Sequence, residues 1–165
     1  MSDAELPGPA DARIRVLRLL EAEVPEIAAG TVQVRAIARE PGLRTKIAVS
    51  SSDPGIDPVG ACLGPTGARH RSLRAQLGDE HVDIMQWDAE PQKFVAAALG
   101  PATAVAVVID SDTRTARVRV PKDQLSLAIG RDGQNARLAA KLTGWGLDIK
   151  PAENGVAKSQ EVRLF

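Results

Sequence analysis

The sequence predicts a mixed α/β (α+β) protein made of two related units in tandem. Its 165 residues are 44% hydrophobic and 25% charged, which is typical of a globular chain that buries a core. Segments with helical and strand patterns recur in the order helix, strand, strand, helix, helix, strand, and this order occurs twice. An offset of 66 residues superposes the second occurrence on the first, so each unit is about 65 residues long.

The first unit begins with apolar residues at helical spacing over 11–24, which predict a helix that Pro25 ends. Residues 31–37 alternate between apolar and polar side chains, so we expect a strand with Ala36 on its apolar face. A Pro-Gly turn separates this strand from a second strand over 46–49, which predicts a hairpin.

The rest of the first unit contains two helices and a third strand. Asp57 is suited to cap a short helix, which Gly64 then ends. A longer helix is expected over 67–77, and residues 81–87 predict the last strand.

The second unit repeats these features. We expect a helix over 94–99, strands over 103–109 and 115–120, a helix that ends at Thr143 and a last strand over 146–149. The offset places Asp123 on Asp57, so we expect Asp123 to cap the short helix of this unit. The predicted organisation is a flexible N-terminal segment over 1–10, a first domain over 11–88, a second domain over 89–150 and a tail over 151–165.

Each unit carries a G-x-x-G motif between its short and its long helix, at Gly64-Pro65-Thr66-Gly67 and Gly130-Arg131-Asp132-Gly133. With 14 glycines in the chain such a motif can arise by chance, so the equivalent position in both units is the informative observation. Glycines let a sugar-phosphate backbone approach the main chain closely, and the N terminus of the following helix attracts phosphate. The motifs therefore predict two phosphate-binding loops.

Basic residues follow both motifs. They are Arg69, Arg71 and Arg74 in the first unit and Arg137 and Lys141 in the second, with Arg131 inside the second motif. For one unit alone, a tight turn followed by a solvated helix face is the better interpretation. The recurrence of loop and basic helix together in both units favours phosphate binding.

Other classes of function find little support. The single cysteine, Cys62, excludes an internal disulfide, and His70 and His81 lack the spacing of two metal ligands on one helix face. No nucleophile with a matching base and no clustered carboxylates occur, so we expect no enzyme, no metal and no cofactor. No apolar run is long enough for a membrane span and the N terminus does not resemble a signal peptide, which predicts a cytoplasmic protein without a membrane partner.

Three stretches carry a family resemblance: IAREPGLRTKIAVSS at 37–51, DPVGACLGPTGAR at 57–69 and VPKDQLSLAIGRDGQNARLAAKLTGWGLDI at 120–149. They resemble the tandem KH region of the NusA family of transcription elongation, termination and antitermination factors. This resemblance implies two type II KH domains, each a three-stranded sheet with helices on one face. Family members carry further domains before the KH pair, so we expect either a KH fragment or a reduced, free-standing relative.

The resemblance also implies that single-stranded nascent RNA crosses both loops, with RNA polymerase or other transcription factors as further candidate partners. A protein-interaction adaptor on a KH scaffold is the alternative function. The bases are expected in a shallow apolar groove lined by residues such as Val59, Leu63, Leu125 and Ile129. The candidate RNA-binding residues are Gly64, Pro65, Thr66, Gly67, Arg69, Arg71, Arg74, Lys122, Gly130, Arg131, Asp132, Gly133, Gln134, Asn135, Arg137 and Lys141.

The charge distribution and the two loops refine this expectation. The chain has 21 Lys and Arg against 21 Asp and Glu, but residues 31–78 and 113–141, which contain the motifs, carry net charges of +4 and +5. Two Trp, two Phe and no Tyr leave little aromatic surface for base stacking, which favours backbone binding. Pro65 has no N–H donor whereas Arg131 adds positive charge, so the second loop is predicted to bind RNA more strongly.

Overall fold

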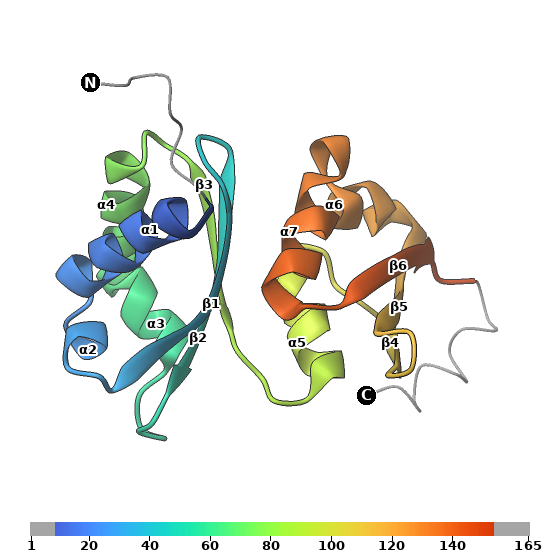
Figure 1. The fold of residues 1–165 in the computed structure, drawn as a ribbon, viewed down its shortest axis with the longest axis horizontal. Helices are drawn as coiled ribbons and strands as arrows, with labels where there is room; N and C mark the ends of the chain where they lie inside the picture. Colours follow the sequence, from blue (N-terminus) through green and yellow to red (C-terminus); the bar gives the residue numbers. More distant parts are fainter. Residues whose placement is uncertain (1–8, 154–165) are drawn as a thin grey trace. The chain divides into compact units, whose positions relative to one another are not determined.

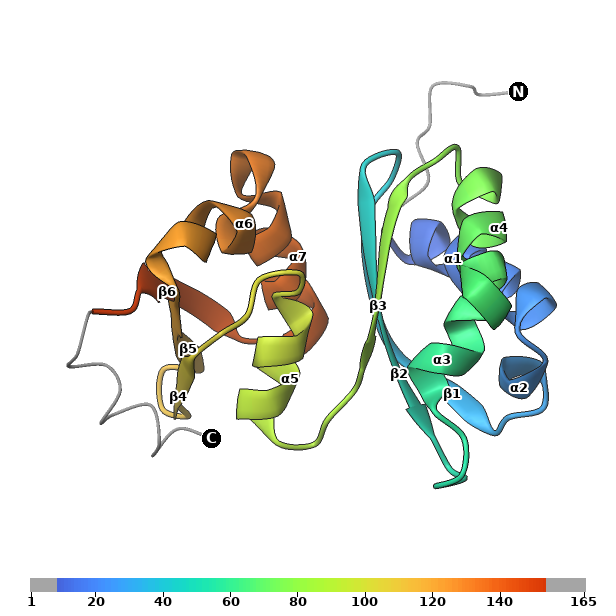
Figure 2. The same ribbon diagram turned by 180° about the vertical axis from the view of Figure 1, so that it is seen from behind.

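The computed structural model describes residues 9–153, with side chains from residue 12 onward (Figures 1 and 2). The N-terminal segment and the tail expected from the sequence lie mostly outside the described residues. The chain divides into two compact units, residues 1–84 and 85–165, which are described here one at a time. Within the described part of the chain, no helix is long and apolar enough to cross a membrane.

The first unit is a three-stranded sheet with its helices on one face (Figure 1). Strand order is β1-β2-β3, and β1 runs antiparallel to β2. Pro25 follows the first helix, as predicted, but it also begins the unpredicted α2, because the fixed φ of proline suits the first helical position. The elements are α1 (Pro9–Glu23), α2 (Pro25–Ala28), β1 (Val32–Glu40), β2 (Arg44–Ser51), α3 (Pro58–Leu63), α4 (Ala68–Gln76) and β3 (His81–Gln86).

Strand β1 does not alternate along its whole length as predicted. Its register against β2 shifts between Val34 and Ala36, which makes Arg35 the extra residue of a β-bulge. Beyond the bulge Ile37, and not Ala36, follows Val34 on the face that packs against the core. The prediction for Ala36 was therefore wrong, because one extra residue reverses which side chains face the helices.

The core of the first unit lies between the sheet and its helices. Val16 and Leu20 of α1 pack with Ile47 and Val49 of β2, and all four are at most 1% exposed. Cys62 joins this core, and burial raises the pKa of its thiol to about 11. Cys62 is therefore a free cysteine that fills a buried position in the core.

The second unit repeats the arrangement around the sheet β4-β5-β6 (Figure 2). Strand β5 is antiparallel to β4 and parallel to β6, and the parallel pair requires the long helical crossover between them. The fold class predicted from the sequence is thus confirmed. The elements are α5 (Pro91–Ala98), β4 (Ala106–Asp110), β5 (Thr115–Val120), α6 (Leu125–Ile129), α7 (Gln134–Thr143) and β6 (Gly146–Pro151).

The caps of the two short helices differ. Asp57 caps α3 as predicted, because its side chain accepts a hydrogen bond from the Val59 backbone N–H at 3.1 Å. Asp123 instead lies inside a 3₁₀ turn, Lys122–Gln124, and the residue that precedes α6 is Gln124, without a side-chain cap. The prediction for Asp123 was wrong because this extra turn moves the start of the helix.

Candidate nucleic-acid interface

The two G-x-x-G loops have the same backbone conformation. The first glycines, Gly64 and Gly130, have φ/ψ of 74°/174° and 80°/171°. The second glycines, Gly67 and Gly133, have 76°/17° and 76°/10°, and each donates its N–H to the carbonyl of the first glycine, at 3.0 and 3.1 Å. We call residues 64–67 the first loop and residues 130–133 the second loop.

The longer helices begin directly after the loops. Gly67 and Gly133 occupy the N-cap positions of α4 and α7, and neither helix has a side-chain cap there. The Ala68 and Gln134 N–H groups donate to the carbonyls of Pro65 and Arg131 within the loops. The next N–H groups of the first helical turn have no side-chain cap, and in an α-helix they lack a partner within the helix. Both helices direct the positive end of their dipole toward the loop, which favours a bound anion such as phosphate.

Two equivalent arginines lie against the loop backbone. Arg71 donates a hydrogen bond from Nη1 to the carbonyl of Thr66, and Arg137 donates one from Nη1 to the carbonyl of Asp132 at 3.0 Å. Both side chains are exposed, so their charge lies at the loop surface in each unit. The structure thus brings these two candidate residues next to the loops.

Two further candidates, Arg69 and Asn135, point inward. Arg69 donates from Nη1 to the carbonyl of Ala61 at 2.7 Å and to Oε1 of Glu26 at 3.1 Å. Asn135 is fully buried, and its Nδ2 donates to the carbonyls of Ala128 and Leu99 at 2.9 and 3.1 Å. Neither side chain is presented at the loop surface.

The remaining candidates lie in the two loops, in the turn before α6 and along α4 and α7. Arg131 is exposed within the second loop, together with Asp132 and, in the first loop, Pro65 and Thr66. Gln134 begins α7, Lys122 is exposed in the turn before α6, and Lys141 is exposed in the last turn of α7. Arg74 lies in the last turn of α4, where Nε and Nη2 donate to the carbonyls of Glu80 and Asp79, away from the loop.

Apolar side chains lie on the short helices, as the groove prediction requires. Val59, Leu63 and Leu125 are partly buried, and Ile129 is 37% exposed. Leu127 of α6 is more exposed than any of these, at 46%, and the sequence reasoning did not include it. The sequence could have identified Leu127, because Leu125, Ala128 and Ile129 lie three and four residues apart on one helix face and Leu127 falls outside that spacing.

Two networks of buried charges in the first unit were missed. Glu80 accepts hydrogen bonds from Arg39, from the Gly42 N–H and from the Thr45 hydroxyl, and burial raises its pKa less than these donors lower it. Asp83 binds Arg44 and Lys46, and these cations lower its pKa despite burial. These networks link strands and turns and lie away from the loops, so they serve the fold.

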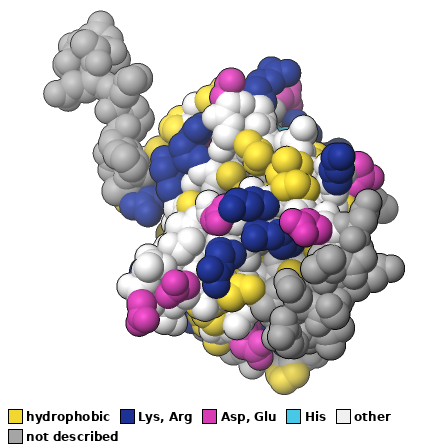
Figure 3. Space-filling model, turned by 90° about the vertical axis from the view of Figure 1, so that its right-hand side faces the viewer, with side chains coloured by type: hydrophobic (Ala, Val, Ile, Leu, Met, Phe, Trp, Pro, Cys, Tyr) yellow, Lys and Arg dark blue, Asp and Glu magenta, His cyan; other side chains and the backbone are white. Residues whose placement is uncertain are grey.

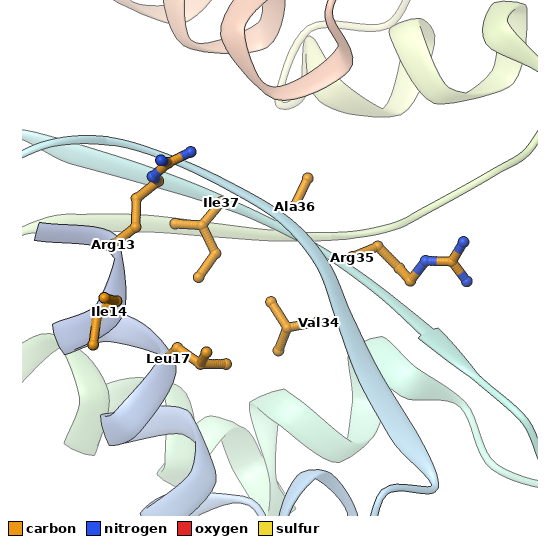
Figure 4. A pocket seen from close by; sticks show the side chains of 7 residues that line it. All are labelled: Arg13, Ile14, Leu17, Val34, Arg35, Ala36 and Ile37. Atoms are coloured by element: carbon orange, nitrogen blue, oxygen red, sulfur yellow. The ribbon is translucent and has the colours of Figure 1, made fainter. Parts of the chain in front are cut away.

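A hollow lies between α1 and β1 and was not predicted. Its volume is about 330 Å³ and its apolar lining includes Ile14 and Leu17 of α1 and Val34 and Ile37 of β1 (Figure 4). Arg13 and Arg35 contribute the charged side chains, and both point away from the centre of the hollow (Figure 4). The hollow is separate in sequence and element from both loops.

The helix-free face of the second sheet carries charges of both signs. Arg117 pairs in register with Asp148, and Arg119 with Lys150, whereas the alternate residues of β5 are buried. Figure 3 shows Lys and Arg side chains gathered with Asp and Glu side chains beside them. No group of three His, Cys, Asp or Glu side chains in the described ranges could hold a metal ion.

Two units of order helix, strand, strand, helix, helix, strand, each with a glycine loop before its longer helix, define a tandem KH protein. Family comparisons agree, because residues 13–87 match the NusA-like first KH domain and residues 91–156 match the NusA-like second KH domain. The chain belongs to the NusA family of tandem KH proteins.

Curated relatives support the same assignment. The chain is 52% identical over 135 residues to the transcription termination/antitermination protein NusA of Thermus thermophilus, covering 82% of this chain and 35% of that protein. It is 55% identical over 136 residues to the protein of the same name from Mycobacterium tuberculosis, covering 82% of this chain and 39% of that protein. The chain thus spans little more than a third of these relatives' length.

A solved structure shows the same fold at lower sequence similarity. The crystal structure of APE1850 matches with a TM-score of 0.58 and 23% identity, covering 83% of this chain and 99% of that one. At this identity the likeness concerns the fold alone.

Proposed function

We propose that the chain binds single-stranded RNA through its two loops and acts in transcription elongation, termination or antitermination by contacting the nascent transcript. The observation that carries this proposal is the identical backbone of the two loops, each followed by a helix N terminus without a side-chain cap. RNA polymerase or other transcription factors are proposed as further partners. The proposed role is non-enzymatic and lies in the cytoplasm.

In the proposed mechanism the loops hold the RNA backbone and the short helices contact the bases. Phosphates approach the backbone of Gly67 and Gly133 closely, because glycine has no side chain that would stand between the backbone and the ligand. The first-turn N–H groups and Arg131 supply the attraction. Bases lie over the apolar side chains of α3 and α6, and hydrogen bonds to base edges supply specificity in place of aromatic stacking.

A charge substitution in each loop tests the proposal. Gly133→Asp places a carboxylate where a phosphate would bind, and Gly133→Asn is the matched control, because asparagine has the same size and also adopts positive φ. We expect Gly133→Asp to bind a short single-stranded RNA at least about tenfold more weakly than Gly133→Asn, measured by fluorescence anisotropy at low salt. Equal affinities for the two variants, both with native circular dichroism, would refute phosphate binding at this loop.

The same pair of substitutions at Gly67 tests the predicted ranking of the loops. Pro65 lacks an N–H and no arginine lies within the first loop, so Gly67→Asp should weaken RNA binding less than Gly133→Asp does. The affinity should also fall steeply with salt, by about 0.7 in log K per log unit of salt for each phosphate contact. A protein that binds no RNA at low salt would instead fit the protein-interaction adaptor.

A further inference from the structure

The residue five positions after the first glycine of each loop lies in the first turn of the helix that follows, and it has the same place in both units. It is Arg69 in the first unit and Asn135 in the second, and the repeat offset of 66 superposes them. Both lie directly beneath the first glycine of their loop. A Cβ added at Gly64 would lie 2.5 Å from Cγ of Arg69, and one added at Gly130 would lie 2.8 Å from Cβ of Asn135.

Both side chains tie the loop to other parts of their own unit. Asn135 bridges the carbonyl of Ala128 in α6 and the carbonyl of Leu99, which follows α5. Arg69 bridges the carbonyl of Ala61 in α3 and the carboxylate of Glu26 in α2. In each unit the link therefore runs from the short helix to the helix that precedes the sheet.

The two links differ in chemistry. Asn135 is a neutral amide with 0% exposure, whereas the Arg69 and Glu26 side chains are 26% and 31% exposed. The Arg69 guanidinium also contributes its charge to an ion pair and turns away from the loop surface. A phosphate at the first loop would have to compete with Glu26 for this group.

We propose that Arg69 is a positioning residue of the first loop, held by Glu26, and not a ligand of the RNA phosphate. This inference rests on the proposed RNA-binding function. It predicts that Glu26, an acidic residue in an RNA-binding protein, strengthens RNA binding, because its charge keeps Arg69 beneath Gly64. A phosphate-binding Arg69 predicts the opposite sign, since a nearby carboxylate would then compete with the RNA.

The variant Glu26→Lys tests whether Glu26 strengthens or weakens RNA binding. This variant breaks the pair with Arg69 yet adds positive charge to the protein, so simple electrostatics predicts tighter RNA binding. We expect affinity for a short single-stranded RNA about two- to fivefold weaker than that of the unmodified chain. Glu21→Lys is the matched control, because Glu21 is exposed on α1 and the charge change is the same. It should leave the affinity unchanged or slightly higher.

A double substitution and the salt dependence separate positioning from contact. In an Arg69→Met background, Glu26→Lys should weaken RNA binding no further, because the partner is already gone. Arg69→Met should lower the affinity and leave the slope of log K against log salt unchanged, whereas Arg131→Met should reduce that slope by about 0.7. A slope reduced in Arg69→Met, or an affinity unchanged or raised in Glu26→Lys, would overturn the proposal.

A measurement without RNA distinguishes failure of this inference from failure of the proposed function. The Gly64 and Gly67 amides donate hydrogen bonds within the first loop region, and Gly130 and Gly133 provide the equivalent amides in the second. Glu26→Lys should speed hydrogen exchange at Gly64 and Gly67 while Gly130 and Gly133 exchange as before. Unchanged exchange at the first loop would overturn the positioning role, whether or not the chain binds RNA.

Discussion

The two glycines of the second loop are expected to differ sharply in their effect on stability. Gly130 has φ 80° and ψ 171°, a conformation almost confined to glycine, which costs about 1–3 kcal/mol for another residue. An alanine Cβ there would also lie 2.8 Å from the Asn135 backbone nitrogen, and such overpacking costs about 1–3 kcal/mol more. The lower entropy of alanine in the unfolded chain offsets about 0.4–1 kcal/mol. Gly130→Ala should therefore destabilise by about 1–5.6 kcal/mol.

Gly133 has φ 76° and ψ 10°, the left-handed helical region, which costs alanine about 1–2 kcal/mol. An added Cβ would meet only Nη1 of Arg137, at 3.8 Å, an ordinary contact. After the same entropy offset, Gly133→Ala should destabilise by about 1 kcal/mol. The difference arises because Gly130 packs tightly onto Asn135, whereas the nearest atom to a Cβ at Gly133 is the end of the flexible Arg137 side chain.

Tryptophan fluorescence during urea unfolding measures the difference in stability between these two variants, because it follows the unfolding of the second unit. Trp145 lies in the second unit, and Trp87 packs edge-on against Phe94 of α5 with ring centroids 6.4 Å apart, so both tryptophans report on this unit. We expect Gly130→Ala to lower the urea midpoint several times more than Gly133→Ala does, with the slope unchanged. A midpoint for Gly133→Ala equal to or below that of Gly130→Ala would refute the assignment of packing to the first glycine and ligand approach to the second.

Further outcomes are expected for three buried side chains, those of Asn135, Glu80 and Cys62. Asn135→Ala removes hydrogen bonds to two carbonyls and should destabilise the second unit by about 2–3 kcal/mol in the same fluorescence assay. Glu80→Gln should destabilise the first unit by about 3–5 kcal/mol in circular dichroism melts, because Arg39 is left without its buried carboxylate. The lowered pKa of Glu80 means that its stabilisation is full above about pH 4.3, the usual unfolded value, and is lost as pH falls through the folded value; Glu80→Gln should remove that pH dependence. With a thiol pKa of about 11, Cys62 should react with iodoacetamide at pH 8 only as urea unfolds the first unit, and rapid labelling of the native protein would contradict its burial.

Local signals in the sequence were sufficient for the repeat and for the loops. Glycines at 64, 67, 130 and 133 are required by backbone angles that other residues rarely adopt, so their pattern is visible without any knowledge of the fold. The Asp57 cap was predicted for the same reason, because it depends on a hydrogen bond two residues along the chain. Features set by neighbouring residues are the ones that sequence patterns report well.

Features set by distant residues were missed. The bulge at Arg35 depends on how β1 pairs with β2, and no pattern in the neighbouring residues predicts it. The ion pair of Arg69 was not predicted either, because its partner Glu26 is 43 residues away in a helix that the sequence analysis did not predict. The direction of a long side chain depends on such tertiary partners, so spacing alone could not reveal it.

Ion pairs with distant partners also change how the net charges of residues 31–78 and 113–141 relate to the positive potential at the two loops. Residues 31–78 carry a net +4, but Arg39, Arg44 and Lys46 form ion pairs with Glu80 and Asp83, which lie just outside that range. Because these cations are held inside the first unit, the net charge of the block overstates the positive potential available at its loop. In the second unit, Arg131 and Lys141 are exposed on or behind the loop. The positive potential therefore favours the second loop by more than the two net charges suggest, which is an independent reason to expect Gly133→Asp to weaken RNA binding more than Gly67→Asp.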